Sequence, residues 1–165
     1  MNAFKWVKAE VPRGLEVRQV YGFIFSSDGR ILLLEDEGQY NLPGGKPENS
    51  ESMNETLIRE ALEEGQVVIS SPEYLGYQFI EGNDEYAQVR LVASMERILP
   101  SASDPSTGRH YSRLWVPPIL ANDLLTWGVS GDQQLATAIA AASIKGVSWG
   151  GTPLEYIDIS SQSLS

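Results

Sequence analysis

Residues 45–67 read GKPENSESMNETLIREALEEGQV and hold the strongest pattern in the chain. Ser52 followed by Glu55 forms a capping-box pair, which predicts that a helix begins there. The residues from Met53 to Glu64 include no Pro or Gly and are rich in good helix formers. At about 100° per residue, one arc of this helix is apolar, and we expect it to face a core: Leu57, Ile58, Ala61 and Leu62.

Three carboxylates fall together on an adjoining arc of the predicted helix. Glu60, Glu63 and Glu64 stand at i, i+3 and i+4, where like charges repel by roughly a few tenths of a kcal/mol per pair. A neutralising cation would explain why they lie beside a buried face. Hard divalent ions such as Mg²⁺ take oxygen ligands, commonly one or two carboxylates plus substrate phosphates. The arc therefore indicates a divalent-cation site.

The loop before the helix has the composition of a segment that approaches a ligand closely. Residues 41–47 read NLPGGKP. The adjacent glycines Gly44 and Gly45 let the backbone turn sharply and come near another group. We therefore expect this loop to approach a phosphate.

The spacing from Gly45 through Glu51, Arg59-Glu60 and Glu63-Glu64 resembles the Nudix box, G-x5-E-x7-R-E-U-x-E-E-x-G-U, with U an apolar residue. Every fixed or apolar position matches except one. The resemblance implies a metal-dependent hydrolase that cleaves the pyrophosphate bond of a nucleoside diphosphate linked to another moiety. It also implies an α/β/α sandwich with a mixed β-sheet between helices.

The resemblance carries roles to particular residues. It implies that Glu51 and Arg59 pair and hold the loop in register. The carbonyl of Gly44 would join the glutamates as a ligand of Mg²⁺ or Mn²⁺. The alternative role for Glu60 or a nearby carboxylate is that of the base for the attacking water. The implied catalytic residues are Glu51, Arg59, Glu60, Glu63 and Glu64, the implied metal ligands are Glu60, Glu63, Glu64 and Gly44, and the phosphate-approaching residues are Gly44 and Gly45.

One position departs from the pattern. Gln66 stands where the box has a glycine, and Gly65 comes one residue earlier. The pattern's glycine ends the helix in a left-handed conformation. We therefore expect the helix to stop one residue early, just after Glu64, which would alter the placement of that side chain.

Composition predicts one compact domain. The 165 residues are 42% hydrophobic, and we expect a single domain over residues 1–159 with a frayed tail at 160–165. The chain has no Cys, no apolar run of membrane-spanning length and no secretory signal within residues 1–12, so a cytoplasmic location is expected. A net charge of −10 argues against nucleic-acid binding and implies that divalent ions bridge the protein to an anionic substrate.

Alternation and turn signals outline the remaining elements. Strands are expected at residues 17–25, 31–34, 67–69, 74–80, 87–95 and 114–116. A final helix is expected to begin at a Ser130–Gln133 capping box, to stop at Lys145-Gly146 and to pack opposite the acidic helix. This order of elements is typical of the sandwich around a mixed sheet.

Other residues are weaker candidates. The loop acids Glu81, Asp84 and Glu85 are candidates for an additional carboxylate, and Tyr40, Tyr77 and Phe79 for stacking on a base or sugar. The run 109–113, RHYSR, is a candidate contact for a terminal phosphate, and its His110 is expected to be a plain residue of a mobile loop over 99–111.

Three functions remain open at the level of sequence. The first is a Mg²⁺- or Mn²⁺-dependent Nudix hydrolase of a small nucleotide, with a homodimer possible and no membrane partner. The second is a catalytically weak Nudix-like domain that senses a nucleotide metabolite. The third is an acidic structural module. The full set of glutamates favours the first, but no motif identifies the substrate.

Overall fold

The computed structural model describes residues 3–144 and 157–158. The expected helix stop at Lys145-Gly146 and the expected frayed tail at 160–165 lie outside these residues. The elements in chain order are β1 (Ala3–Val7), β2 (Val17–Phe25), β3 (Ile31–Asp36), β4 (Gln39–Asn41), β5 (Gly44–Gly45), α1 (Met53–Gly65), β6 (Val67–Ile69), β7 (Glu73–Glu81), β8 (Tyr86–Ile98), β9 (Ser112–Val116), α2 (Pro118–Leu125), α3 (Gly128–Ile144) and β10 (Ile157–Asp158).

The strands form a mixed sheet. Its order is β1-β7-β8-β2-β3-β9-β10, with β4 paired to β3, β5 to β2 and β6 to β8. The central pair, β2 with β8, is parallel, whereas the other described pairs are antiparallel. The parallel pair joins β2, which comes before α1 in the chain, to β8, which comes after it, so the connection that contains the helix crosses one face of the sheet.

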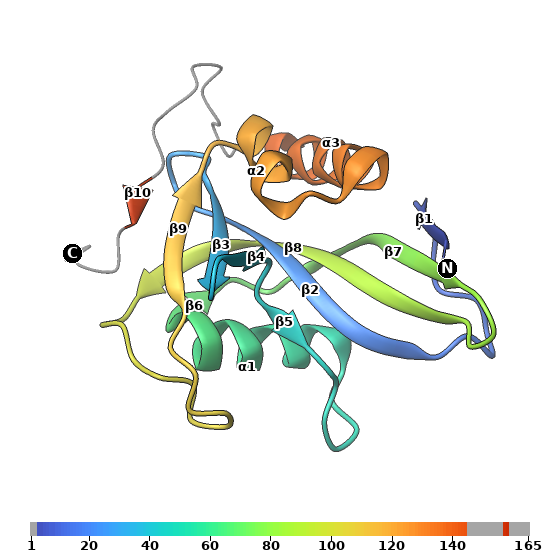
Figure 1. Cartoon of the computed structure of the whole chain (residues 1–165), viewed down its shortest axis with the longest axis horizontal. Helices are drawn as coiled ribbons and strands as arrows, with labels where there is room; N and C mark the ends of the chain where they lie inside the picture. Colours follow the sequence, from blue (N-terminus) through green and yellow to red (C-terminus); the bar gives the residue numbers. More distant parts are fainter. Residues whose placement is uncertain (1–2, 145–156, 159–165) are drawn as a thin grey trace.

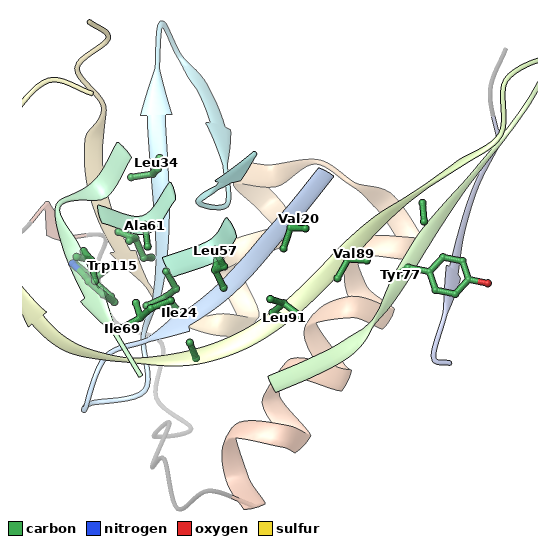
Figure 2. Packing of buried hydrophobic residues seen from close by; sticks show 14 residues of the cluster. Val20, Ile24, Leu34, Leu57, Ala61, Ile69, Tyr77, Val89, Leu91 and Trp115 are labelled. Carbon is green, nitrogen blue, oxygen red and sulfur yellow. The ribbon is translucent and has the colours of Figure 1, made fainter. Parts of the chain in front are cut away.

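Helices cover both faces of the sheet, as Figure 1 shows: α1 lies on one side, and α2 and α3 on the other. On the first face, Leu57 and Ala61 of α1 pack against Val20 and Ile24 of β2 (Figure 2). On the second face, apolar side chains of α3, such as Leu135, join a separate core. The predicted α/β/α sandwich with a mixed sheet is confirmed.

The packing of α1 corrects one expectation. Leu57 and Ala61 are fully buried, but Ile58 and Leu62 are 43% and 45% exposed. The predicted core-facing arc was therefore too wide, because the helix touches the sheet along a narrower stripe. Gly22 on β2 permits the close contact, since a Cβ there would strike the side chain of Leu57.

Arg90 corrects a second expectation. Arg90 alternates with the apolar residues Val89 and Leu91 in the strand expected at 87–95, a pattern typical of a half-buried strand with one polar face, yet it is only 1% exposed. The reason is that α3 covers this face, so both sides of the strand are buried. Period-two alternation shows which residues share a face, but not whether another element covers it.

The start of α3 corrects a third expectation from the sequence. The helix begins at Gly128, so Ser130 lies inside it and does not cap it. The Ser130 hydroxyl instead donates to Gln78 Oε1 at 3.0 Å. Neither β1 nor α2 was predicted from the sequence. No helix in the described ranges is long and apolar enough to span a membrane.

Candidate active site

The end of α1 differs from the sequence expectation. Gly65 is helical, and Gln66 takes the left-handed conformation, with φ 51° and ψ 43°. The prediction of an early stop is therefore wrong. Gln66 Nε2 donates to the Glu63 carbonyl at 2.9 Å, and Gln66 Oε1 accepts from the Ala102 amide at 3.1 Å. These bonds offset the strain of a left-handed non-glycine residue, so Glu64 keeps its place on the helix.

Arg59 lies among the glutamates of the acidic arc. Its Nε donates to Glu51 Oε2 at 2.7 Å, as the resemblance implied. Its NH1 group donates to Glu60 Oε1 at 2.9 Å and to Glu63 Oε2 at 3.2 Å. Its NH2 group donates to the Lys46 carbonyl at 3.1 Å. Arg59 thus joins the loop, the helix start and two carboxylates of the arc.

The glycine loop lies directly against the acidic arc. The Gly44 amide donates to Glu64 Oε1 at 2.9 Å. At Gly45, an added Cβ would strike the carboxylate of Glu60. Glycine at these positions therefore lets the loop backbone meet both carboxylates, and the loop also pairs with β2 as β5.

Two carboxyls of the arc, those of Glu60 and Glu64, have raised pKa values. Burial raises the pKa of Glu64 to about 8; the Gly44 amide opposes this shift, while the charges of Glu60 and Asp104 add to it. Burial also raises the pKa of Glu60, against the lowering effect of Arg59. Buried carboxylates that repel one another are stabilised by a cation.

Asp104 is a site residue that sequence reasoning missed. It is 3% exposed and lies close enough to raise the pKa of both Glu60 and Glu64. Its loop, residues 99–111, is tied to the helix end because Ser106 Oγ donates to Glu63 Oε2 at 3.2 Å. The Asp-Pro-Ser sequence signals the local turn, in which the Ser106 amide donates to Asp104 Oδ1 at 2.8 Å, but not the direction in which that turn faces.

An acidic cleft of about 600 Å³ opens beside Glu64 and Gly44. Two residues of the run 109–113, Arg109 and Tyr111, line this cleft. Arg109 NH1 pairs with Asp36 Oδ2 at 2.8 Å at the cleft edge. Arg113 is buried and donates to the Gly65 carbonyl at 3.1 Å, so it holds the end of α1. His110 contacts Ser101 Oγ at 3.1 Å outside the cleft.

The remaining candidates are not brought to this cleft. None of the loop acids Glu81, Asp84 and Glu85 is among the described residues that line it, and Asp84 pairs with Arg18 at 2.7 Å. The aromatic candidates do not line it either: Tyr77 and Phe79 pack with the α1-side core, and Tyr40 is half-buried on β4.

The site offers an oxygen donor set suited to a hard divalent ion. As the side chains stand, no three Asp, Glu or His residues converge to hold a metal within residues 3–144 and 157–158. The reason lies in Arg59, which takes a cation's place between Glu60 and Glu63. The donors nevertheless fit, because the partly buried carboxyls of Glu60 and Glu64 have raised pKa values, and they lie against the backbone of Gly45 and Gly44, respectively.

A family model described as the NUDIX domain matches residues 16–136. The chain belongs to the NUDIX domain family. This membership agrees with the resemblance drawn from the sequence. No curated protein matches the chain by sequence.

Solved structures of Nudix proteins share the fold. A mutant of the Bacillus subtilis pyrophosphohydrolase BsRppH is 24% identical with a TM-score of 0.55, and the match covers 62% of this chain and 65% of that chain, just under two thirds. MutT from Aliivibrio salmonicida or Vibrio cholerae is 21% identical with a TM-score of 0.54, covering 75% and 96%. The C. elegans Ap4A hydrolase is 17% identical with a TM-score of 0.51, covering 77% and 98%.

Proposed function

We propose that the protein hydrolyses a pyrophosphate bond in a nucleoside diphosphate linked to another moiety, with Mg²⁺ or Mn²⁺ as cofactor. The observation that carries the proposal is the contact of the glycine loop with the acidic arc. The Gly44 amide bonds to Glu64, and Gly45 lies against Glu60. The Gly44 backbone and the Glu64 carboxylate thus meet in the lining of the acidic cleft.

Each residue of the box has a part in the proposal. Glu60, Glu63, Glu64 and the Gly44 carbonyl would hold the metal. When bound, the metal would polarise the phosphoryl oxygens, lower the pKa of a bound water and neutralise the leaving group. Arg59 and Glu51 are positioning residues, since their ion pair ties the loop to the helix. The protein's work is thus mainly alignment and charge stabilisation.

The cleft also supports the binding of an anionic substrate. Arg109 is the exposed cation at its edge, and its partner Asp36 leaves other guanidinium donors available. A phosphate in the cleft would therefore meet Arg109 on one side and the metal site on the other. The structural neighbours range from a pyrophosphohydrolase to an Ap4A hydrolase, so they support the reaction class and not one substrate.

The test is a panel of nucleoside diphosphate derivatives incubated with the protein and Mg²⁺, with phosphorylated products separated by ion-exchange chromatography. At least one compound should be cleaved, and chelation of the metal with EDTA should stop the cleavage. Glu64→Gln should lower turnover by about a hundredfold or more. Glu85→Gln is the matched control, because Glu85 is exposed and outside the cleft, and its turnover should equal that of the wild type.

Two results would count against the proposal. If no compound is cleaved but one raises the melting temperature, the protein is a nucleotide sensor. If Glu64→Gln cleaves as fast as the wild type, the metal-site assignment is wrong.

A further inference from the structure

A second hollow lies beside the acidic cleft and shares two residues with it. This side pocket has a volume of about 340 Å³. Tyr21 and Asn41 line both the side pocket and the acidic cleft. A substrate whose pyrophosphate lies in the acidic cleft would therefore place an adjoining group in the side pocket.

Arg90, on β8, is a buried cation in the wall of the side pocket. No carboxylate of the described residues lies within 4.0 Å of its guanidinium. The guanidinium stacks instead on two rings, 5.1 Å from the centroid of Tyr21 and 4.9 Å from that of Trp127. A buried charge without an anion is costly, so hydrogen-bond acceptors near Arg90 are strongly stabilised.

Arg90 fixes the orientation of the amides around it, because arginine has donors and no acceptor. Its Nε bonds to Gln134 at 2.8 Å, so the atom that accepts there must be Gln134 Oε1. Gln134 Nε2 then donates to Gln78 Oε1 at 2.7 Å. That oxygen also accepts from Ser130 Oγ at 3.0 Å.

This relay of hydrogen bonds, from Arg90 through Gln134 to Gln78, leaves a donor group of Gln78 available in the side pocket. Gln78 lines this pocket, and its Nε2 has no hydrogen-bond partner among the residues that the structure describes. Arg90 fixes the orientation of the Gln88 amide in the same way. Its Oε1 accepts from Arg90 NH2 at 3.3 Å, and its Nε2 donates to Gln19 Oε1 at 2.6 Å. The amide oxygens of these glutamines are thus engaged within the protein.

The side pocket is rich in donors in a chain that is acidic overall. None of the described residues that line it is Asp or Glu, although the chain has 22 acidic residues against 12 basic ones. Phe4, Tyr21 and Trp127 supply aromatic surface. An aromatic wall suits a flat ring, and a wall of donors suits a ring that carries acceptors.

We propose that the side pocket binds the substrate's nucleobase and selects a base that presents carbonyl oxygens over one that presents an amino group. Hypoxanthine, guanine and uracil present a carbonyl oxygen where adenine and cytosine present an amino donor. An amino donor would meet the Gln78 Nε2 group and Arg90, and neither can accept its hydrogen bond. The identification of the ligand as the base of a substrate rests on the proposed function.

The test uses nucleosides without phosphate or metal, so that it depends on neither cleavage nor the acidic cleft. Inosine and adenosine form one matched pair, and uridine and cytidine the other. Each is titrated in EDTA into ¹⁵N-labelled protein, and the indole N–H signal of Trp127, assigned from Trp127→Phe, reports occupancy. Inosine and uridine should bind about tenfold or more tightly than adenosine and cytidine, respectively.

Gln78→Glu tests the relay itself. A carboxylate in this variant can accept from Gln134 and Ser130 as before, while its second oxygen replaces the available donor. The preference should therefore reverse toward adenosine and cytidine. Gln133→Glu is the matched control, because it adds the same charge at an exposed position of α3, the helix that carries Ser130 and Gln134, and should keep the wild-type preference. Phe4 is 59% exposed. Phe4→Ala should weaken the binding of all four nucleosides to a similar extent.

Equal affinities within both pairs, or no shift of the Trp127 signal with any nucleoside, would overturn the inference. The same holds if Gln78→Glu folds and retains the wild-type preference. A protein that cleaves nucleotides but shows no preference would refute this inference alone. A protein that binds inosine but cleaves no nucleotide would refute the proposed hydrolysis alone.

Discussion

Arg59 donates to both carboxylate oxygens of Glu51, from Nε to Oε2 at 2.7 Å and from NH2 to Oε1 at 3.1 Å. This two-pronged ion pair joins the loop before α1 to the middle of the helix, and both side chains are mostly buried. The same guanidinium also bonds to Glu60 and Glu63. The pair therefore fixes the frame within which the acidic arc is placed.

Removing the charge of Glu51 should destabilise the fold. Glu51→Gln is expected to lower the free energy of unfolding by about 1–3 kcal/mol, because Arg59 loses a charged, paired acceptor. Urea denaturation measures the loss. Glu48→Gln is the control: Glu48 is exposed and its Oε2 lies 3.7 Å from Arg59 Nε, so the change should stay within about 0.5 kcal/mol. Equal losses in the two variants would contradict the structural role of the pair.

The same pair predicts a pH dependence of stability. Hydrogen bonds from Arg59 lower the pKa of Glu51 from an ordinary value of 4.5 to about 2. A carboxyl whose pKa is lower in the folded state binds fewer protons there, so its stabilisation is present above pH 4.5 and is lost as the pH falls through about 2. The stability difference between wild type and Glu51→Gln should therefore shrink between these two values. Urea denaturation at pH 6, 4 and 3 follows it, and a constant difference would argue against the lowered pKa.

Gln66 should respond differently to glycine and alanine. Both substitutions remove the side-chain bonds to Glu63 and Ala102. Only glycine also relieves the left-handed backbone, which costs an ordinary residue roughly 1–2 kcal/mol. Gln66→Gly should therefore be about 1 kcal/mol more stable than Gln66→Ala in thermal denaturation. Hydrogen exchange at the Ala102 amide should accelerate in both variants, and protection unchanged from wild type would show that the loop does not depend on this residue.

A methyl group at Gly45 should impair turnover more than stability. In Gly45→Ala the new Cβ displaces the Glu60 carboxylate, which is the far end of a flexible side chain, so the fold should survive. Misplacement of about 1 Å at a catalytic group can cost about a hundredfold in rate, and kcat on a cleaved substrate measures it. Gly65→Ala is the control, because its Cβ would meet nothing nearer than 3.5 Å. That variant should be neutral or stabilised by about 0.5–1 kcal/mol, with unchanged kcat.

Mg²⁺ should stabilise the protein through the acidic arc. At a concentration about a hundredfold above its dissociation constant, a ligand specific for the native state adds about 2.7 kcal/mol. The melting temperature of the wild type should rise with added Mg²⁺, and that of Glu60→Gln should rise much less. An equal rise in both proteins would place the ion elsewhere.

The sequence predicted the elements whose signals are local. The alternating and apolar runs predicted β2 over its full length, Val17–Phe25, and the capping box predicted the start of α1 at Met53. The pairing of Arg59 with Glu51 was implied by the resemblance to the Nudix box. The first two features depend only on neighbours along the chain or within one turn of helix.

The sequence could not predict what depends on distant segments. Arg90 reads as a surface residue until α3 covers its face of the sheet. Asp104 reads as a loop acid until the end of α1 turns that loop toward Glu60 and Glu64. Gln66 replaces a glycine because two contacts, one of them to Ala102, outweigh backbone strain. In each case a tertiary contact overrides a local preference.

The sheet separates two cores, one beneath α1 and one beneath α2 and α3. Substitutions in separate cores with no shared contacts add nearly independently in free energy. Mutations in the layer of α2 and α3 can therefore accumulate during evolution without shifting the glutamates of α1. Tyr21 is an exception, because it lines both hollows and its pKa, which burial raises, is lowered by Arg90 and raised further by Glu64 and Glu60. A lineage that changes its preferred nucleotide is free to vary most of that layer, but any change at Tyr21 alters recognition and chemistry together.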